Sequence, residues 1–204
     1  FDTWRLVGDV LGREDRAESI VAFVRETIAD LEQRAETIPS DETKSAYVGA
    51  ISYKGAHGIA TTRKRFAPFR WAGVENVAGG IDIDAPSVQV SDEQLLAWDP
   101  ETVFLSAGNL GRAREDIRSN PEYGSIEAIG TGETYSLLPH ANYHHNYGSI
   151  LANAYFVGKT VYPDRFEDVS VPAKADEIFA TLLGAPLYDD LHEEYEAFQR
   201  LDPE

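Results

Sequence analysis

The segment SDEQLLAWDPETVFLSAGN, residues 91–109, decides the fold of this chain, because it contains a complete helix–strand unit. Ser91 is the predicted N-cap, since its hydroxyl can accept a hydrogen bond from the first helical turn, and two acidic residues follow it. Pro100 ends the helix. Residues 102–108, TVFLSAG, are apolar on both sides of an extended chain. That pattern is typical of a central strand in a parallel sheet, which is buried on both faces.

Helical and extended patterns alternate along the rest of the chain. Over residues 13–38 apolar residues recur at steps of three and four, which predicts an amphipathic helix roughly 40 Å long, enough to bridge two parts of a protein. The sequence therefore predicts an α/β fold, a Rossmann-like, mostly parallel sheet flanked by helices and preceded by a long N-terminal bridging helix. The other expected helices span 3–11, 62–73, 112–120, 142–161, 172–183 and 188–201, and the other expected strands span 46–53, 87–90 and 134–138.

Composition narrows the class of protein. The chain has 204 residues, of which 43% are hydrophobic, and this is enough for one substantial core. Its net charge of −17 argues against nucleic-acid binding, which needs a basic face. It has no cysteine, so disulfides and thiolate metal sites are excluded. We see no run of eighteen apolar residues, which predicts that no helix of this chain spans a bilayer.

Five segments follow one another in a characteristic order. In that order they resemble the interlobe helix and C-terminal half of the cluster-III, or TroA-like, periplasmic binding proteins, the iron-chelate, haem and cobalamin receptors of ABC importers. The segments are VGDVLGREDRAESIVAFV (7–24), FRWAGVENVAGG (69–80), VSDEQLLAWDPETVFL (90–105), NPEYGSIEAIGTGETYSLLP (120–139) and NYGSILANAYFVGKTVYPDRFEDVSVPAKADEIFATLLGAPLY (146–188).

The resemblance implies a domain organisation. Residues 1–40 would form the interlobe backbone helix, and residues 41–204 the C-terminal α/β lobe of a two-lobed binding protein. The N-terminal lobe of the family is absent from the sequence. Because the chain begins at Phe1 and contains no Met, we expect it to be a fragment or a processed form of a longer protein.

The resemblance also implies a function. The chain would belong to the substrate-binding component of an ABC importer, which captures an iron chelate or a metal complex between two lobes. It would have no intrinsic cofactor, and its ligand would be an iron–siderophore, haem, a corrinoid or a metal ion. Its partners would be the transmembrane permease subunits. The full-length protein would work in the periplasm or at the extracellular face of the cell membrane, held by a lipid anchor that is not in this chain.

The candidate ligand-binding residues follow three predicted strands. Ligands of open α/β sheets bind at the carboxyl ends of the strands, where the loops meet. Five of the 18 basic residues fall within residues 54–70, and such a patch in an acidic protein suits a carboxylate, catecholate or phosphate ligand. Surface ion pairs explain the same patch equally well. The candidates are Tyr53, Lys54, His57, Arg63, Arg65, Ser106, Asn109, Tyr143 and Asn146.

The candidate metal ligands are His140, His144 and His145. Imidazole binds iron, nickel, cobalt and zinc, and it also serves as an axial ligand of haem. His140 and His144 would share one face of a helix if the helix began early, although Pro139 opposes an early start. No acidic residue stands beside the three histidines to orient them, so ordinary loop hydrogen bonding is the alternative.

Two further functions are compatible with the sequence. The chain could be a metal-dependent chelatase- or hydrolase-like enzyme on a related fold, with His140 and His144 as ligands, but it contains none of the usual catalytic motifs. It could also be an interaction lobe without a ligand of its own. We expect a binding protein and not an enzyme.

Overall fold

A parallel sheet forms the centre of the protein in the computed structural model, which describes residues 1–51, 57–83, 85–142 and 144–202. Neighbouring strands of this sheet follow the order β3-β1-β5-β6, and every pair is parallel. The predicted α/β class with a mostly parallel sheet is therefore confirmed. The strands are β1 (Ser45–Gly49), β3 (Glu75–Asn76), β5 (Thr102–Ser106) and β6 (Thr134–Leu137).

The segment at residues 91–109 forms the predicted helix–strand unit. The helix α4 (Asp92–Trp98) is capped by the Ser91 hydroxyl, whose oxygen accepts a hydrogen bond of 3.2 Å from the amide of Gln94. The strand β5 lies between β1 and β6 and is buried at every position. A continuous apolar run thus became an interior strand because both of its faces are covered.

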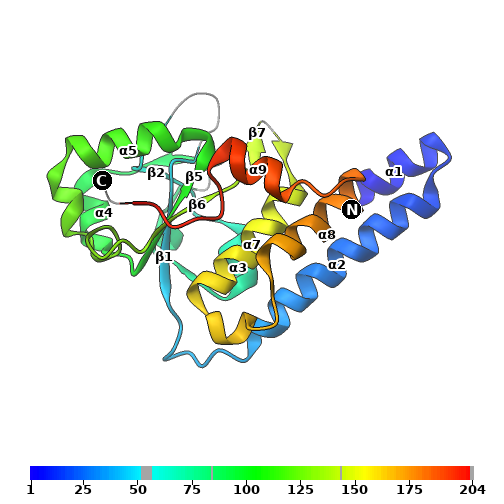
Figure 1. The fold of residues 1–204 in the computed structure, drawn as a ribbon, viewed down its shortest axis with the longest axis horizontal. Helices are drawn as coiled ribbons and strands as arrows, with labels where there is room; N and C mark the ends of the chain where they lie inside the picture. Colours follow the sequence, from blue (N-terminus) through cyan, green and yellow to red (C-terminus); the bar gives the residue numbers. More distant parts are fainter. Residues whose placement is uncertain (52–56, 84, 143, 203–204) are drawn as a thin grey trace.

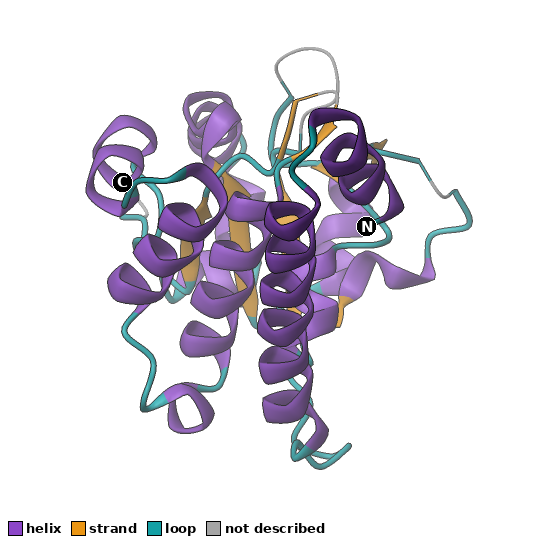
Figure 2. Ribbon diagram, turned by 90° about the vertical axis from the view of Figure 1, so that its right-hand side faces the viewer, coloured by secondary structure: helices purple, strands orange, loops and turns teal. Residues whose placement is uncertain are grey.

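Helices cover both faces of the sheet, so the molecule has three layers (Figures 1 and 2). One face packs against α4, α5 (Leu110–Ser119) and α6 (Glu127–Gly130). The other packs against α3 (Ala67–Ala72), α7 (Tyr147–Val161), α8 (Val171–Leu183) and α2 (Glu14–Glu36). Successive strand residues alternate between the two cores, as the pleat requires: Tyr47, Val103 and Leu105 belong to the first, and Val48 and Phe104 to the second.

The long helix expected over 13–38 is present as α2, whose 23 residues span about 35 Å at 1.5 Å per residue, and its role as a bridge stays a prediction. It follows the short helix α1 (Asp2–Leu11), and Gly12, with a left-handed φ of 62°, ends α1. The two helices pack closely where Gly8 meets Ala17, because a Cβ added at Gly8 would lie 2.6 Å from the Ala17 Cβ. Both helices agree with the expected boundaries to within two residues.

Two of the expected elements next to β1 are shorter than predicted. The strand expected over 46–53 ends at Gly49, since Ala50 has a positive φ of 57° that breaks the extended chain. The helix expected over 62–73 begins only at Ala67, with Pro68 in its first turn. The preceding residues form β2 (Thr61–Thr62), which pairs in antiparallel register with β4 (Val88–Gln89). That pairing joins segments far apart in the sequence, so no local sequence pattern predicts it.

The last expected helix is also shorter. The helix α9 (Tyr188–Tyr195) stops because Glu196 adopts a left-handed φ of 50°. The chain then returns beside β6, where the Phe198 amide donates to the Ser136 carbonyl at 3.0 Å. The remaining elements are η1 (Val77–Gly80), η2 (Ala107–Asn109), η3 (Pro121–Ser125), β7 (Ala141–Asn142), β8 (His144–His145) and η4 (Pro163–Phe166).

No helix in the described part of the chain combines the length and the apolar character that crossing a membrane requires.

Candidate functional site

The candidate site lies at the carboxyl edge of the sheet, the upper edge in Figure 1. Strands β1, β5 and β6 are adjacent and parallel, with Gly49 paired to Leu105 and Ser106 paired to Leu137. Their carboxyl ends therefore meet at one edge, and the segments that follow them lie side by side. The described candidates that directly follow β1, β5 and β6 therefore lie beyond the ends of neighbouring strands, and their role in a common site stays a prediction.

Asn109 ties two of these loops together. Its side chain is buried, and its amide nitrogen donates a hydrogen bond of 3.0 Å to the carbonyl oxygen of Ala50. Ser106, three residues earlier, is also buried. Both residues are buried parts of the structure at this edge, and their contact with a ligand stays a prediction.

His57 lies in a segment that helix α5 holds in place. Asp116 on α5 accepts a hydrogen bond of 3.1 Å from the amide of Ile59, and it pairs with Arg112 at 3.0 Å. A Cβ built on Gly58 would lie only 1.6 Å from the carboxylate oxygen of Asp116. The ring nitrogen Nε2 of His57 is buried and has no hydrogen-bond partner among the described residues. His57 therefore presents a buried polar atom at this edge.

Arg63 and His140 meet across the edge, although 77 residues separate them. The guanidinium nitrogen Nη1 of Arg63 lies 2.8 Å from Nε2 of His140. His140 is 5% exposed, and its ring stands edge-on to Phe66 with the ring centroids 5.2 Å apart. Burial, with smaller contributions from the charges of Arg63 and His145, lowers the pKa of His140 to about 3. The imidazole is therefore neutral at physiological pH.

The three histidines do not lie on a helix. The helix expected over 142–161 begins at Tyr147, so the early start that would have placed His140 and His144 on one helical face is wrong. Instead β7 and β8 pair as a short antiparallel hairpin, and Asn146 caps α7 by accepting a hydrogen bond of 3.3 Å from the Ser149 amide. An N-cap fixes where a helix starts, and the cap at Asn146 places the start of α7 later than residue 142, where the sequence pattern had suggested it.

The predicted metal set stays a prediction. Among the described residues no group of three or more His, Asp or Glu side chains could hold a metal ion. His140 is buried, and His145 is exposed. The side chain of His144 lies outside what the structure describes. Tyr53, Lys54 and Tyr143, three of the predicted ligand-binding residues, also lie outside the described residues.

Two hollows are lined in part by candidate residues. His145 and Asn146 line one of them together with Trp4 and Tyr147, whose rings meet edge to face at a centroid distance of 4.9 Å. The other lies beside α3 and is cationic, and Arg70 also stacks over the Trp71 ring at 5.7 Å. The basic cluster of the sequence is thus split, with Arg63 turned to His140 and three cations around the second hollow. That hollow is lined by Lys64, Arg65, Phe66, Ala67, Phe69, Arg70, Val74 and Asn76.

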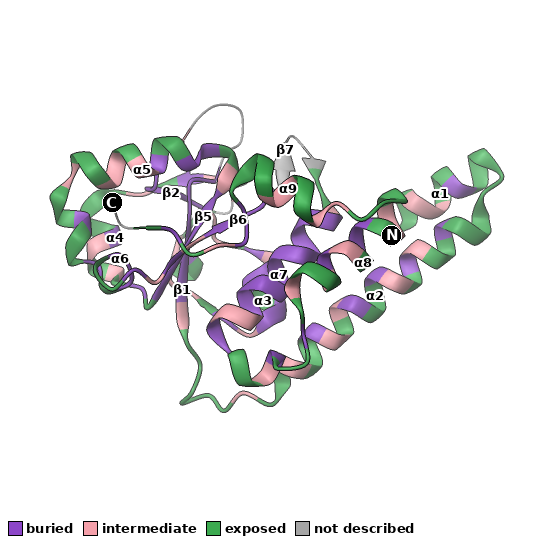
Figure 3. Ribbon diagram, viewed as in Figure 1, coloured by how far each residue is buried: buried purple, intermediate pink, exposed green. Residues whose placement is uncertain are grey.

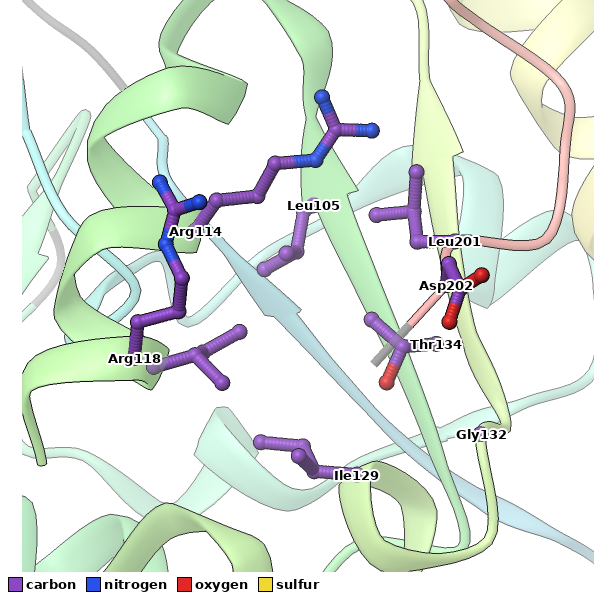
Figure 4. Close-up of a pocket in the computed structure, with 9 residues that line it drawn as sticks. Leu105, Arg114, Arg118, Ile129, Gly132, Thr134, Leu201 and Asp202 are labelled. Carbon is purple, nitrogen blue, oxygen red and sulfur yellow. The ribbon is translucent and has the colours of Figure 1, made fainter. Parts of the chain in front are cut away.

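A third hollow lies away from the carboxyl edge, between α5, α6 and the start of β6 (Figure 4). Leu105 and Ile129 form part of its apolar floor, and Arg114 and Arg118 stand at its rim. Arg114 pairs with Glu196 at 2.9 Å. Thr134, at the amino end of β6, also lines it, so this hollow does not face the loops that carry the candidate residues.

Sequence reasoning missed a set of contacts that fixes α2 to α7 and to the segment before α8. Arg34 on α2 binds Asp168 through two hydrogen bonds of 2.7 and 2.8 Å and pairs with Asp30 at 3.1 Å. The Tyr155 hydroxyl on α7 donates to Asp30 at 2.6 Å. The Arg34 guanidinium lowers the pKa of Asp168 to about 2. The spacing of Asp30 and Arg34 on one helical face was visible, but Asp168 is 134 residues away and carried no signal.

The chain is similar to known proteins over most of its length. A family model described as periplasmic binding protein matches residues 1–141. An uncharacterised ABC transporter substrate-binding lipoprotein of Bacillus subtilis, YvrC, is 21% identical over 168 residues, which cover 82% of this chain and 51% of that protein. The Fe(3+)-citrate-binding protein YfmC of the same organism is 24% identical over 135 residues, 66% of this chain and 41% of that protein.

Solved structures show the same fold. An ABC transporter solute-binding protein from Sulfurospirillum deleyianum superposes with a TM-score of 0.74 at 18% identity, covering 95% of this chain and 60% of that one. The molybdate periplasmic binding protein MolA of Haemophilus influenzae, bound to molybdate, gives 0.69 at 17% identity, covering 90% of this chain and 55% of that one. The chain spans about half the length of the curated relatives it matches.

Proposed function

Since this chain belongs to the periplasmic binding protein family, we propose that it contributes one lobe and the bridging helix to the substrate-binding component of an ABC importer. In this proposal an iron chelate or another anionic metal complex is captured between this lobe and a second one. The observation that carries it is that β1, β5 and β6, which precede the candidate loops, are adjacent and parallel, so that their carboxyl ends meet at one edge of the sheet. The family comprises binding proteins, which disfavours the chelatase- or hydrolase-like alternative.

The exposed face of α1 supports a two-lobed arrangement, with residues 1–40 as the bridge and residues 41–204 as the C-terminal lobe. Val10 is 75% exposed and Leu11 67%, and Leu6 and Val7 on the same helix are exposed as well (Figure 3). Helices normally bury an apolar stripe against another element. A preceding lobe packed on α1 would cover these four side chains.

The charge of the edge supports an anionic ligand. The protein carries a net charge of −17, yet Arg63 reaches across the carboxyl edge and Arg65 is exposed nearby. An arginine in such surroundings favours carboxylate, catecholate or oxoanion groups. Two relatives have names that point to ligands of this charge, Fe(3+)-citrate for one and molybdate for the other. In the proposal the remaining candidate ligand-binding residues, together with His144 and His145, contact the ligand or its metal.

The same proposal places the full-length protein on the outer side of the membrane, where it delivers its ligand to the permease subunits of the importer. A lipid anchor on the full-length protein would hold it there, as the description of one relative as a lipoprotein suggests. Such an anchor acts through acyl chains, so it requires no spanning helix.

Calorimetry of the full-length protein tests this function. Ferric citrate, a ferric hydroxamate, haem, cobalamin, molybdate and Ni²⁺ would be titrated separately at constant ionic strength. We expect saturable binding of at least one anionic metal complex, weakened about tenfold or more by Arg63→Met. Arg118→Met, on the exposed surface of α5, is the matched control and should bind as the wild type does. Absence of binding to all six probes would contradict the proposal.

A further inference from the structure

We propose that His140 is a positioning residue, which holds the Arg63 guanidinium at the carboxyl edge of the sheet through the lone pair of its Nε2 atom. This inference rests on the proposed function, because the role that it assigns to Arg63 is to meet an anionic ligand. It assigns His140 a different role from that of a metal ligand.

The hydrogen-bond chemistry of the pair allows one arrangement. A guanidinium group has only N–H donors and no acceptor. The 2.8 Å contact between Arg63 Nη1 and His140 Nε2 therefore has Arg63 as the donor and the imidazole nitrogen as the acceptor. A neutral imidazole that accepts at Nε2 carries its proton on Nδ1. The contact thus fixes both the charge and the tautomer of His140.

The surroundings of His140 keep the ring neutral and in place. The side chain is 5% exposed and packs edge-on against Phe66, and burial is the main reason that the pKa is lowered to about 3. The backbone is held as well, since the His140 carbonyl accepts a hydrogen bond of 2.9 Å from the amide of Asn146. An imidazole restrained in this way is a fixed acceptor, and a fixed acceptor restricts the rotamers of the arginine that it binds.

Holding Arg63 in advance favours binding. A free arginine loses side-chain entropy when a ligand orders it, and a preordered one loses less. The contact also joins the segment after β2 to the segment after β6, so the cation sits between two loops of the edge. The same geometry opposes metal binding by His140, since Nε2 faces a cation and Nδ1 carries the proton.

The first test concerns the tautomer and needs no ligand. Long-range ¹H–¹⁵N spectra of the ¹⁵N-labelled full-length protein at pH 7.5 report which ring nitrogen is protonated, and the His140→Gln variant assigns the signals. We expect protonated Nδ1, unprotonated Nε2, and a shift of the Nε2 resonance in Arg63→Met. A protonated Nε2, or direct broadening of the His140 resonances by Ni²⁺ at stoichiometric concentration, would overturn the inference.

The second test is a double-mutant cycle with ferric citrate as the probe. His140→Phe should weaken binding between about threefold and tenfold, and His140→Gln, whose amide oxygen can accept from Arg63, should restore most of the affinity. In the Arg63→Met background, His140→Phe should have no further effect. Equal losses in both backgrounds would show that the two residues act independently and would overturn the inference. Melting curves of each variant separate these effects from unfolding.

The two proposals fail in different ways. If the wild type binds no anionic metal complex, the proposed function fails, while the tautomer experiment still decides the role of His140. If the wild type binds ferric citrate and the cycle shows no coupling, the function stands and the role of His140 is refuted.

Discussion

The carboxylate of Asp116 occupies the space that a side chain at position 58 would need. A Cβ on Gly58 would lie 1.6 Å from Asp116 Oδ2, and the same oxygen accepts the Ile59 amide at 3.1 Å. The absence of a side chain at Gly58 is therefore what allows α5 to hold the segment that contains His57.

Gly58→Ala should displace Asp116 and destabilise the protein by about 1–3 kcal/mol, because the added atom meets a charged group that is itself hydrogen-bonded. Urea denaturation followed by circular dichroism measures the change. Gly111→Ala, on the helix α5 that carries Asp116, is the control, since a Cβ there meets nothing within 4 Å. It should be neutral or slightly stabilising, as alanine favours helix more than glycine does. Equal stability of both variants would refute the role of Gly58.

Gly158→Ala should destabilise the contact between α7 and η4 by about 1–3 kcal/mol. A Cβ at Gly158 would lie 2.2 Å from the ring of Phe166, which is fully buried. Combining it with Phe166→Leu should recover part of the loss, because the smaller side chain makes room. Thermal unfolding of the two single variants and the double variant gives the coupling, and strictly additive losses would contradict the steric explanation.

His140 should make stability depend on pH in weak acid. Its pKa is about 3 in the folded protein, below the ordinary value of 6.5, so the unfolded chain binds the proton more readily between these values. The contribution of His140 to the free energy of unfolding is then fully present above about pH 6.5. It falls as the pH falls toward 3, with a slope approaching 1.4 kcal/mol per pH unit. Denaturation series from pH 7 to 4.5 should show a shallower slope for His140→Gln. Identical slopes would mean that the imidazole protonates freely in the fold.

Arg34→Met should lower the midpoint of thermal unfolding by a few degrees, because it removes the two hydrogen bonds to Asp168 and the pair with Asp30. Arg34→Lys should rescue little, since an ammonium group cannot make the two parallel bonds. The difference between wild type and variant should shrink in 1 M salt, which screens exposed charge pairs. A lysine variant as stable as the wild type would show that charge alone suffices.

The exposed face of α1 gives a prediction that compares two chains. In residues 1–204 alone, replacing Val10 and Leu11 by serine should leave the melting temperature almost unchanged, because both side chains are largely exposed. In the full-length protein the same double variant should lower it, since a covering lobe would lose apolar contacts. Equal effects in the two chains would argue against a lobe packed on α1.

Local patterns predicted the parts of the fold that local interactions determine. Ser91 capped its helix and Pro100 preceded a buried strand, as expected, because both effects act within a few residues. The carboxyl end of β1 was misplaced because a residue far away in the sequence decides it. Ala50 is held at a positive φ next to an amide from Asn109, and that partner is 59 residues away.

The site was predictable as a location and much less as a set of contacts. The order of strands and loops predicted that His57, Ser106 and His140 would share one edge of the sheet. It carried no information that His140 would face Arg63, because distant pairings decide the side-chain geometry. The contact between Arg34 and Asp168 is of the same kind.

The close contact of Gly8 with Ala17 sets how near α1 and α2 approach beside the turn at Gly12, and the Arg5–Glu18 pair of 2.6 Å joins the same two helices. A small change in the angle between α1 and α2 would become a large displacement at the far end of anything attached to the amino end of α1. A methyl group at position 8 would push the two helices apart. In a two-lobed protein built on this chain, the opening between the lobes would then depend on the absence of a side chain at Gly8.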